Sequence, residues 1–173
     1  MKYKKDCTVV EAVVILFVRR RAGKEPEVLL GPKTNGPVKG WIIPPGGHLE
    51  EIDQGPIDAG HREGREESGL SAVSSYKVAE LRVEFPDKNK MVLVHVTMCL
   101  QWIGQPKNRK GSGHEWLRFI PFPEIPWDKI PTKEEKWMRL VLFEHRKCVV
   151  WITCGKDRRD VRRVTTRTVE GFQ

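Results

Sequence analysis

Short runs of apolar and β-branched residues dominate the first third of the chain. Residues 8–19 and 27–31 predict two strands, and the segment between them, 22–26, contains the Gly and Pro of a turn. Residues 34–40 hold two Gly and one Pro and predict a loop that leads into the apolar segment 41–43. This part of the chain is therefore expected to contribute strands to one sheet.

A helical pattern replaces the strand pattern after this segment. Gly55-Pro56 predicts a helix start, because Pro is favoured at the first helical position, and Gly69 predicts its end. Gly60 and Gly64 share one face of this helix, since they lie four residues apart. We expect these two small residues to let the helix pack closely on the sheet, at some loss of helix propensity.

Further strand patterns follow in the second half of the chain. Two longer candidates, 76–85 and 90–103, are separated by a turn at 86–89. The remaining strand candidates are Trp116 to Ile120, Val149 to Thr153 and Val161 to Val169. A mostly β chain with two helices on the faces of its sheet is a layered α/β domain.

The second helix is signalled at Thr132. Thr132 and Glu135 have the spacing of a capping box, in which each side chain satisfies the other residue's backbone donor. The apolar stripe of this helix consists of Trp137, Leu140, Val141 and Phe143. We expect that stripe to lie against the sheet.

Composition limits the class of protein. The chain has 173 residues, of which 39% are hydrophobic and 31% charged, as expected for one soluble domain that spans residues 1–173. The longest apolar run, 12–18, is too short to cross a bilayer, and Arg19-Arg20-Arg21 after it favours a strand over a signal peptide. We expect no membrane association. The four cysteines lack metal-ligand spacing, which predicts reduced thiols and a cytoplasmic location.

The charged residues narrow the chemistry. A formal net charge of +8 predicts an anionic partner, which could be a nucleotide, RNA or an acidic surface. On the first predicted helix, Glu63, Glu66 and Glu67 lie at offsets i, i+3 and i+4 and so share one face. Three neighbouring carboxylates repel one another unless a divalent cation lies between them. Because Mg²⁺ takes oxygen ligands and shares its coordination with substrate phosphates, the pattern indicates metal-assisted attack on a phosphate or pyrophosphate.

This helix and the loop before it resemble the Nudix box, whose pattern is G-x5-E-x7-R-E-U-x-E-E-x-G-U with U aliphatic. The second half matches at Arg62, Glu63, Glu66, Glu67, Gly69 and Leu70. Gly64 stands at the first aliphatic position, and the segment from Gly47 to Arg62 is one residue longer than the pattern. The loop glutamate of the family therefore falls on Asp53 or Gln54.

The resemblance implies a fold and a metal site. Nudix hydrolases have an α/β/α sandwich with a mixed, mostly antiparallel sheet, and they use Mg²⁺, with Mn²⁺ as a substitute. By this resemblance the metal ligands are Glu63, Glu66, Glu67, Glu115 and a carbonyl oxygen of Gly46 or Gly47. Arg62 completes the catalytic set of Glu63, Glu66 and Glu67, because it can pair with Glu66 and orient it. The histidines show no partner pattern and are assigned no chemistry: His48, His61, His95, His114 and His145.

Within the superfamily the chain is similar to the MutT-like 8-oxo-dGTP diphosphatases, which hydrolyse oxidised purine nucleoside triphosphates. The similarity extends over about residues 9–169. It implies substrate contacts for Lys33, Trp41 and Glu134. Enzymes of that branch bind the purine through an asparagine that follows the tryptophan of the loop strand. They also use a second tryptophan and neighbouring aspartates later in the chain. This chain has Ile42 at the first place and 130–135, with no tryptophan, at the second.

Two classes of function stay open. The first is a Mg²⁺-dependent pyrophosphohydrolase that converts nucleoside triphosphates, including oxidised forms such as 8-oxo-dGTP, to monophosphate and pyrophosphate. Its alternative substrates are other nucleoside diphosphate derivatives, namely ADP-ribose, a dinucleoside polyphosphate or an RNA 5′ end. A basic C-terminal segment keeps RNA open, although it is not favoured, because basic residues scattered along a strand more often form a solvated face: Lys156, Arg158, Arg159, Arg162, Arg163 and Arg167. The second class is a nucleotide-binding module without catalysis, which the retained glutamates and Arg62 disfavour. The oligomeric state is not predicted.

Overall fold

The computed structural model describes residues 6–108 and 110–172, and its strands form a single mixed sheet. The strands are β1 (Thr8–Arg19), β2 (Glu27–Pro32), β3 (Ile42–Ile43), β4 (Gly46–His48), β5 (Ser71–Phe85), β6 (Lys90–Ile103), β7 (Arg118–Pro121), β8 (Lys147–Cys154) and β9 (Val161–Val169). The helices are α1 (Pro56–Ser68) and α2 (Thr132–Leu142), with short 3-10 helices η1 (Pro86–Lys88), η2 (Phe122–Glu124) and η3 (Trp127–Lys129).

The sheet has the order β3-β2-β1-β6-β5-β8-β9, with β4 also paired to β1 and β7 to β2. Strand β1 is parallel to β6, and β5 is parallel to β8. The other pairs between described strands are antiparallel. The expectation of a mixed, mostly antiparallel sheet is therefore confirmed.

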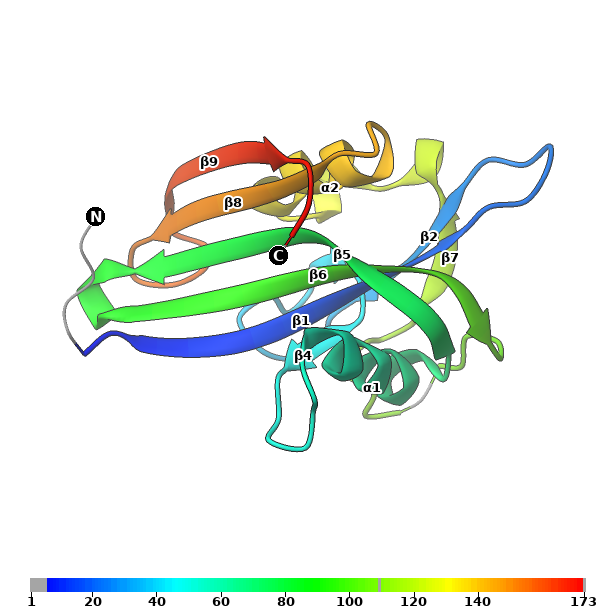
Figure 1. The fold of residues 1–173 in the computed structure, drawn as a ribbon, viewed down its shortest axis with the longest axis horizontal. Coiled ribbons are helices and arrows are strands. Elements are labelled where there is room, and N and C mark those ends of the chain that lie inside the picture. Colours follow the sequence, from blue (N-terminus) through cyan, green and yellow to red (C-terminus); the bar gives the residue numbers. More distant parts are fainter. Residues whose placement is uncertain (1–5, 109, 173) are drawn as a thin grey trace.

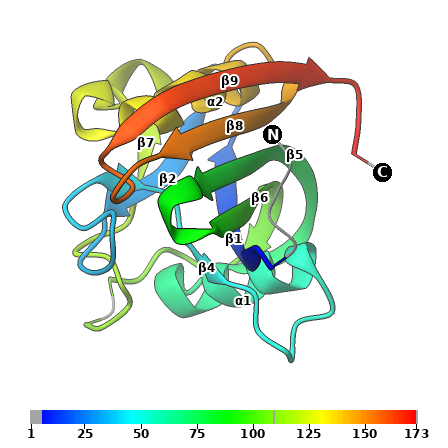
Figure 2. The ribbon, with the colours of Figure 1, turned by 90° about the vertical axis from the view of Figure 1, so that its left-hand side faces the viewer.

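The alternation of side chains along β1 separates two apolar layers. Leu16 and Val18 belong to the larger core cluster, which also contains Trp137 of α2. Ile15 and Phe17 point to the opposite face and belong to a second cluster. Both faces of β1 are therefore covered, which explains why its apolar residues form a continuous run. Figures 1 and 2 show α1 and α2 on opposite sides of the sheet, as in the predicted α/β/α sandwich.

Helix α1 packs on the sheet through its two glycines, as predicted. A Cβ on Gly64 would lie 2.7 Å from Cζ of Phe17, and a Cβ on Gly60 would lie 3.1 Å from Oγ1 of Thr97. Gly69 ends the helix in the left-handed conformation, with φ of 78°. The absence of side chains at the contact face lets the helix axis approach β1 and β6 closely.

Helix α2 starts at Thr132, but Pro131 rather than Thr132 is its N-cap. The predicted capping box is therefore wrong, because Thr132 already lies inside the helix and the Pro131 carbonyl accepts from the backbone N–H groups of Glu134 and Glu135. The apolar stripe is largely confirmed, since Trp137 and Val141 are buried. Phe143 is 43% exposed because the helix has already ended.

Several strand boundaries differ from the predictions, and the largest differences concern β4 and β5. The structure adds β4, a short strand paired with Ala12, Val13 and Val14 of β1, where the glycines had indicated only a loop. Strand β5 starts at Ser71 instead of residue 76, and its first residues are largely exposed. Neither feature has an apolar pattern of its own, because both depend on pairing with a neighbouring strand.

The remaining predictions about the molecule concern its thiols and the membrane. Cys7, Cys99, Cys148 and Cys154 are all free, in agreement with the prediction of reduced cysteines. In the part of the chain that the structure describes, neither helix has the length and apolar character needed to cross a membrane.

Candidate active site

The acidic residues of α1 face the glycine-containing strand β4, but their environments differ. Glu63 and Glu67 are buried, with 9% and 7% of their surface exposed. The side chain of Glu66 is 56% exposed. Figure 1 places α1 beside β4, the element that contains Gly46 and Gly47.

Arg62 connects the loop before α1 with the glutamates on the helix. Its guanidinium donates two hydrogen bonds to Asp53, from Nε to Oδ1 at 3.0 Å and from Nη2 to Oδ2 at 2.9 Å. Nη1 donates to Oε1 of Glu63 at 3.0 Å and to Oε2 of Glu66 at 3.3 Å. Nη2 also donates to the His48 carbonyl at 2.9 Å. The predicted contact with Glu66 is present, but the bidentate pair with Asp53 is the stronger one.

The partner of Arg62 identifies which residue takes the place of the loop glutamate. The Asp53 side chain is only 2% exposed, and the residue next to it, Gln54, bonds through its backbone N–H to Asp58. The hydrogen bonds from Arg62 are the largest cause that holds the pKa of Asp53 below its ordinary value, and they outweigh the opposing effect of burial. The same contacts raise the pKa of Arg62. We therefore assign the loop position to Asp53.

Glu67 is the most heavily contacted of the glutamates. Its Oε1 accepts a short hydrogen bond from Nζ of Lys33, and its Oε2 accepts one from the Gly46 backbone N–H at 3.0 Å. Nδ1 of His114 lies 3.2 Å from Oε2, within ion-pair distance. Burial alone would raise the pKa of Glu67, but the contact with His114 and the charge of Lys33 lower it.

Glu63 has the opposite electrostatic balance. Burial is the largest cause and raises the pKa of Glu63 above its ordinary value. Arg62 opposes the rise, whereas the negative charges of Glu67 and Glu66 add to it. An additional positive charge at this position would therefore stabilise the ionised form.

The two glycines of β4 allow the backbone to approach the carboxylates. A Cβ on Gly47 would lie 2.2 Å from Oε1 of Glu63, and a Cβ on Gly46 would lie 2.3 Å from the Val13 carbonyl oxygen. Any larger residue would have to displace one of these groups. The Gly46 carbonyl accepts a hydrogen bond from Nζ of Lys33 at 3.3 Å, so Lys33 bridges Gly46 and Glu67.

The donor set fits a cation, although the carboxylates are not arranged around one. Within residues 6–108 and 110–172, no group of three His, Cys, Asp or Glu side chains converges on a position that could hold a metal ion. The Lys33 ammonium instead lies between a carbonyl oxygen and a carboxylate, the oxygen types that a hard divalent cation takes. The site therefore already holds a positive charge among the predicted metal ligands.

Three further residues were predicted to belong to the site, namely Glu115, Glu134 and Trp41. The side chain of Glu115 is exposed and forms no hydrogen bond or ion pair with the described residues, while its backbone N–H bonds to the Pro32 carbonyl, next to Lys33. The Glu134 carboxylate accepts a hydrogen bond from Nε1 of Trp137 at 2.6 Å. Trp41 is joined to Lys33 by a backbone hydrogen bond of 3.0 Å from the Lys33 N–H to the Trp41 carbonyl.

Trp41 lines a cavity of about 1100 Å³ that does not include the acidic residues of α1. The loop before β3, the start of α2 and strand β9 form its walls. Strands β3 and β9 lie at opposite ends of the sheet order, so the sheet must curl for both regions to line one cavity. Glu134 is not among the described residues of the lining, since its carboxylate is held by Trp137.

Residues 9–142 match the NUDIX domain model. The chain belongs to the NUDIX domain family. The match covers the acidic helix, β4 and Lys33, and the protein is a Nudix hydrolase. Strands β8 and β9 lie beyond the matched residues but are part of the same sheet. No curated protein matches the sequence.

Several solved structures share the fold of this Nudix protein at low sequence identity. The mutator MutT protein of Bacillus halodurans superposes with a TM-score of 0.74 at 16% identity, over 91% of this chain and 97% of that one. The MutT protein of Methanosarcina mazei Go1 gives a TM-score of 0.65 at 18% identity, over 83% and 100%. The NUDIX domain of Shewanella oneidensis NrtR, solved with ADP ribose, gives 0.60 at 15% identity, over 79% and 90%. At these identities the likeness establishes the fold.

One contributor to the site was missed in the sequence, and one predicted site residue has a partner that was not predicted. His114 was assigned no chemistry, yet it is buried against Glu67, and its bridge to Lys33 brings it there from a distant part of the chain. Lys33 was expected to contact substrate, and in this structure it contacts Glu67. Neither contact has a local sequence signal, because each joins residues more than thirty positions apart.

Proposed function

We propose that this Nudix hydrolase is a Mg²⁺-dependent pyrophosphohydrolase of nucleotides, with nucleoside triphosphates as its simplest substrates and nucleoside monophosphate and pyrophosphate as products. The observation that carries the proposal is the position of the Lys33 ammonium between the Gly46 carbonyl and Glu67. A single positive charge already binds to the oxygens that a divalent cation would require. Mn²⁺ is the expected substitute, since it takes the same ligands.

The residues that would hold the metal are Glu63, Glu67, the Gly46 carbonyl and, from its exposed position, Glu66. A bound Mg²⁺ would neutralise the phosphates and favour formation of the attacking hydroxide. Arg62 orients Glu63 and Glu66 through its own anchor on Asp53. Lys33 supplies a second positive charge that can bind a phosphate oxygen, because it already lies beside Glu67. Glu115 stays a proposed further ligand, on the loop next to Pro32.

Purine recognition in the manner of the 8-oxo-dGTP diphosphatases has less support in the cavity. Ile42 follows Trp41, and Lys133 lies in the lining, where the resemblance had suggested carboxylates. A larger nucleoside diphosphate derivative is a second candidate, because the cavity next to Trp41 is large and basic. The structure of NrtR with ADP ribose shows that a NUDIX domain of this fold can accommodate such a compound.

A substrate panel tests the proposed reaction. The purified protein is incubated with Mg²⁺ or Mn²⁺ and, separately, with ATP, 8-oxo-dGTP, ADP-ribose, diadenosine tetraphosphate and 5′-triphosphorylated RNA. Products are separated by chromatography. We expect release of a nucleoside monophosphate from at least one compound and complete loss of turnover in EDTA. Absence of hydrolysis across the panel would contradict the proposal.

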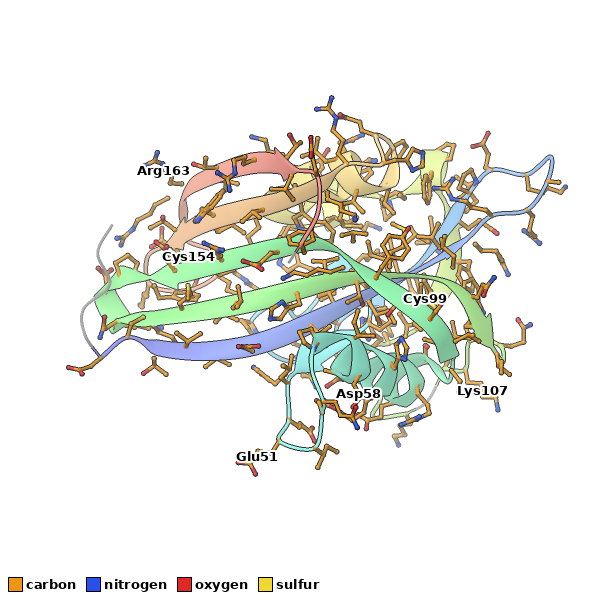
Figure 3. The ribbon with its side chains drawn as sticks, viewed as in Figure 1. Glu51, Asp58, Cys99, Lys107, Cys154 and Arg163 are labelled. Atoms are coloured by element: carbon orange, nitrogen blue, oxygen red, sulfur yellow. The ribbon has the colours of Figure 1, made fainter. Side chains whose placement is uncertain are left out.

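Substitutions on α1 separate catalysis from mere binding. Glu63→Gln and Glu67→Gln should each lower kcat by about a hundredfold or more, because each removes a charge that the metal and its phosphates require. Glu51→Gln is the matched control, since Glu51 lies on the exposed loop before α1 (Figure 3). Circular dichroism should show the same fold in all three variants. A nucleotide-binding module without catalysis would show no difference among them.

A further inference from the structure

The cavity beside Trp41 has a strongly unbalanced charge. Its lining contains seven basic residues and only two acidic ones, Asp128 and Glu135. It lies outside the acidic group on α1, which has the opposite sign. A substrate that extends from one to the other would therefore meet two different electrostatic environments.

Most of the basic side chains in the lining are available to a ligand. Arg139 is already paired with Glu135 at 2.8 Å and lies 4.1 Å above the ring of Trp127. In the described chain, no carboxylate lies within ion-pair distance of the five others that reach the cavity from its rim: Lys39, Lys129, Lys136, Arg158 and Arg159.

Lys133 provides a fixed positive group in the cavity wall. The residue is 5% exposed, and its Nζ donates a hydrogen bond to the Arg158 carbonyl at 2.7 Å. This bond ties the first turn of α2 to the segment that precedes β9. Arg158 is thereby held beside Lys133, and the two positive groups belong to one wall of the cavity.

Several unpaired positive charges around one cavity repel one another in the empty protein. The low-dielectric walls of a cavity concentrate their field more than a convex surface would, and an anion relieves the repulsion. Guanidinium and ammonium groups are the usual protein ligands of phosphate. The charge distribution therefore fits a phosphate group better than a neutral base.

The cavity also has an apolar surface that suits a nucleoside. Trp41, Val161 and Val164 contribute to the lining together with two prolines. An indole ring can stack on a base or a sugar face. At about 1100 Å³, the cavity is at the upper end of the volumes usual for small-molecule sites, so it has room for a base together with a charged group.

Two of the basic residues on the rest of β9 have other partners, which distinguishes them from the basic residues of the cavity. Arg162 pairs with Asp87 at 3.2 Å, and the Arg167 guanidinium lies 5.6 Å from the ring centre of Trp151. Figure 3 shows Arg163 on β9, far from the acidic helix. The basic C-terminal segment is therefore divided among the cavity, these contacts and exposed positions such as Arg163.

We propose that this cavity binds a phosphate group of the nucleotide substrate that is not part of the anhydride being cleaved. The inference rests on the proposed function for the other end of the substrate. Lys33 joins the two regions, because its side chain contacts Glu67 while its backbone bonds to Trp41 and Gly40 of the cavity wall. The substrate class is thus a nucleotide that is phosphorylated at both ends of its nucleoside, or that carries a second phosphorylated nucleoside.

Direct binding of adenosine 3′,5′-bisphosphate in EDTA tests the cavity alone. This compound contains no anhydride, so it cannot be hydrolysed, and without a divalent cation the acidic residues of α1 repel phosphate. We expect calorimetry to show binding that weakens as salt increases. Removal of two charges in Lys136→Gln/Arg159→Gln should raise Kd about tenfold or more, the loss of roughly one charge-assisted hydrogen bond.

Arg163→Gln is the matched control, because it removes a charge from β9 outside the cavity, and its Kd should stay within about twofold of the parent value. Adenosine, which lacks phosphate, should bind far more weakly than the bisphosphate. An equal Kd in the double variant and the parent protein, or equal affinity for adenosine and the bisphosphate, overturns the proposal. Neither result depends on turnover, so failure of the hydrolase proposal is recognised separately.

A turnover assay provides a second test of the proposal. With Mg²⁺, the double variant should raise KM for adenosine 3′-phosphate 5′-triphosphate by a larger factor than KM for ATP, since only the former has a phosphate at the other end of its nucleoside. Equal factors for both substrates would also count against the proposal.

Discussion

At the scale of single residues, Arg62 organises the acidic group. One guanidinium contacts Asp53, Glu63 and Glu66, and it is itself almost fully buried. Buried charges are stable only when paired and hydrogen-bonded, because the desolvation cost of an isolated ion is large. Asp53 is therefore a structural partner of the proposed catalytic set, although it lies on the loop outside the helix.

Asp53→Asn should destabilise the protein by about 3 kcal/mol at pH 7, since it leaves the buried Arg62 without its main counter-charge. Urea unfolding monitored by circular dichroism measures the change. Glu50→Gln is the control, because Glu50 lies 3.4 Å from Nη1 of Arg62 but its side chain is 57% exposed. That variant should lose less than about 0.5 kcal/mol. Equal losses in the two variants would contradict the role assigned to Asp53.

The same pair predicts a pH dependence of stability. Arg62 lowers the pKa of Asp53 from its ordinary value of 3.8, so the stabilising contribution is fully present above that value. It is lost as the pH falls through the lower pKa of the folded state. The difference in unfolding free energy between the parent protein and Asp53→Asn should therefore shrink below about pH 4. A constant difference from pH 7 to pH 3 would exclude this explanation.

At the scale of elements, α1 carries its acidic residues to β4 because two glycines remove bulk from its inner face. An added Cβ would clash more severely at Gly64 than at Gly60. At Gly64 two ring atoms of Phe17 lie within 2.9 Å, whereas at Gly60 the nearest atom is Oγ1 of Thr97 at 3.1 Å. The first contact involves a buried ring that has no free space in which to move.

Gly64→Ala should accordingly destabilise the fold by about 1–3 kcal/mol, the usual cost of overpacking a core. Gly60→Ala should cost less, because the higher helix propensity of Ala, worth about 1 kcal/mol, offsets a milder contact. Thermal unfolding of both variants gives the order. Addition of Phe17→Leu to Gly64→Ala should restore part of the loss. A Gly64→Ala protein as stable as the parent would show that the helix can shift away from β1.

At the scale of the whole molecule, the sheet places its thiols in the interior. Cys99, Cys148 and Cys154 are buried on β6 and β8, whereas Cys7 is only half-buried at the start of β1. Burial raises the pKa of Cys148 to about 11 and also raises that of Cys99 and Cys154. Thiolate formation and reagent access are therefore both suppressed at three of the four positions.

A thiol reagent at pH 8 should modify one cysteine rapidly in the native protein and four in denaturant. Cys7→Ser should remove the rapid phase and leave the slow phases unchanged. Fast modification of two or more thiols in the folded protein would show that the sheet opens more readily than its packing indicates. Spectrophotometric titration is sufficient for this measurement.

The curled sheet also explains how the two charged regions come together. The acidic helix lies near β1 and β4, while the basic cavity is closed by β9 at the far end of the strand order. Residues 33–41 lie between these regions, and the backbone pairing of Lys33 with Trp41 connects them. Both regions therefore depend on strands from distant parts of the chain.

The sequence by itself determined the elements whose pattern is local. The apolar run of β1, the Gly and Pro limits of α1, the spacing of its glutamates and the paired glycines all give signals within a few residues, since helical and strand periodicity act over short distances. The Nudix resemblance rested on the same local features. The exceptions were local as well: the capping box failed because α2 begins at Thr132, with Pro131 as its N-cap.

Tertiary structure decided the contacts between distant segments. The burial of His114 against Glu67, the pairing of β4 with β1 and the basic cavity all depend on how separate parts of the chain pack together. The same packing decided that Asp53 rather than Gln54 is the partner of Arg62. Such contacts produce no repeating pattern in the sequence. The residues next to each of them in the chain would fit an ordinary exposed loop equally well. Local patterns were therefore sufficient for the acidic helix, whereas the charges around the proposed substrate site emerged only from the folded chain.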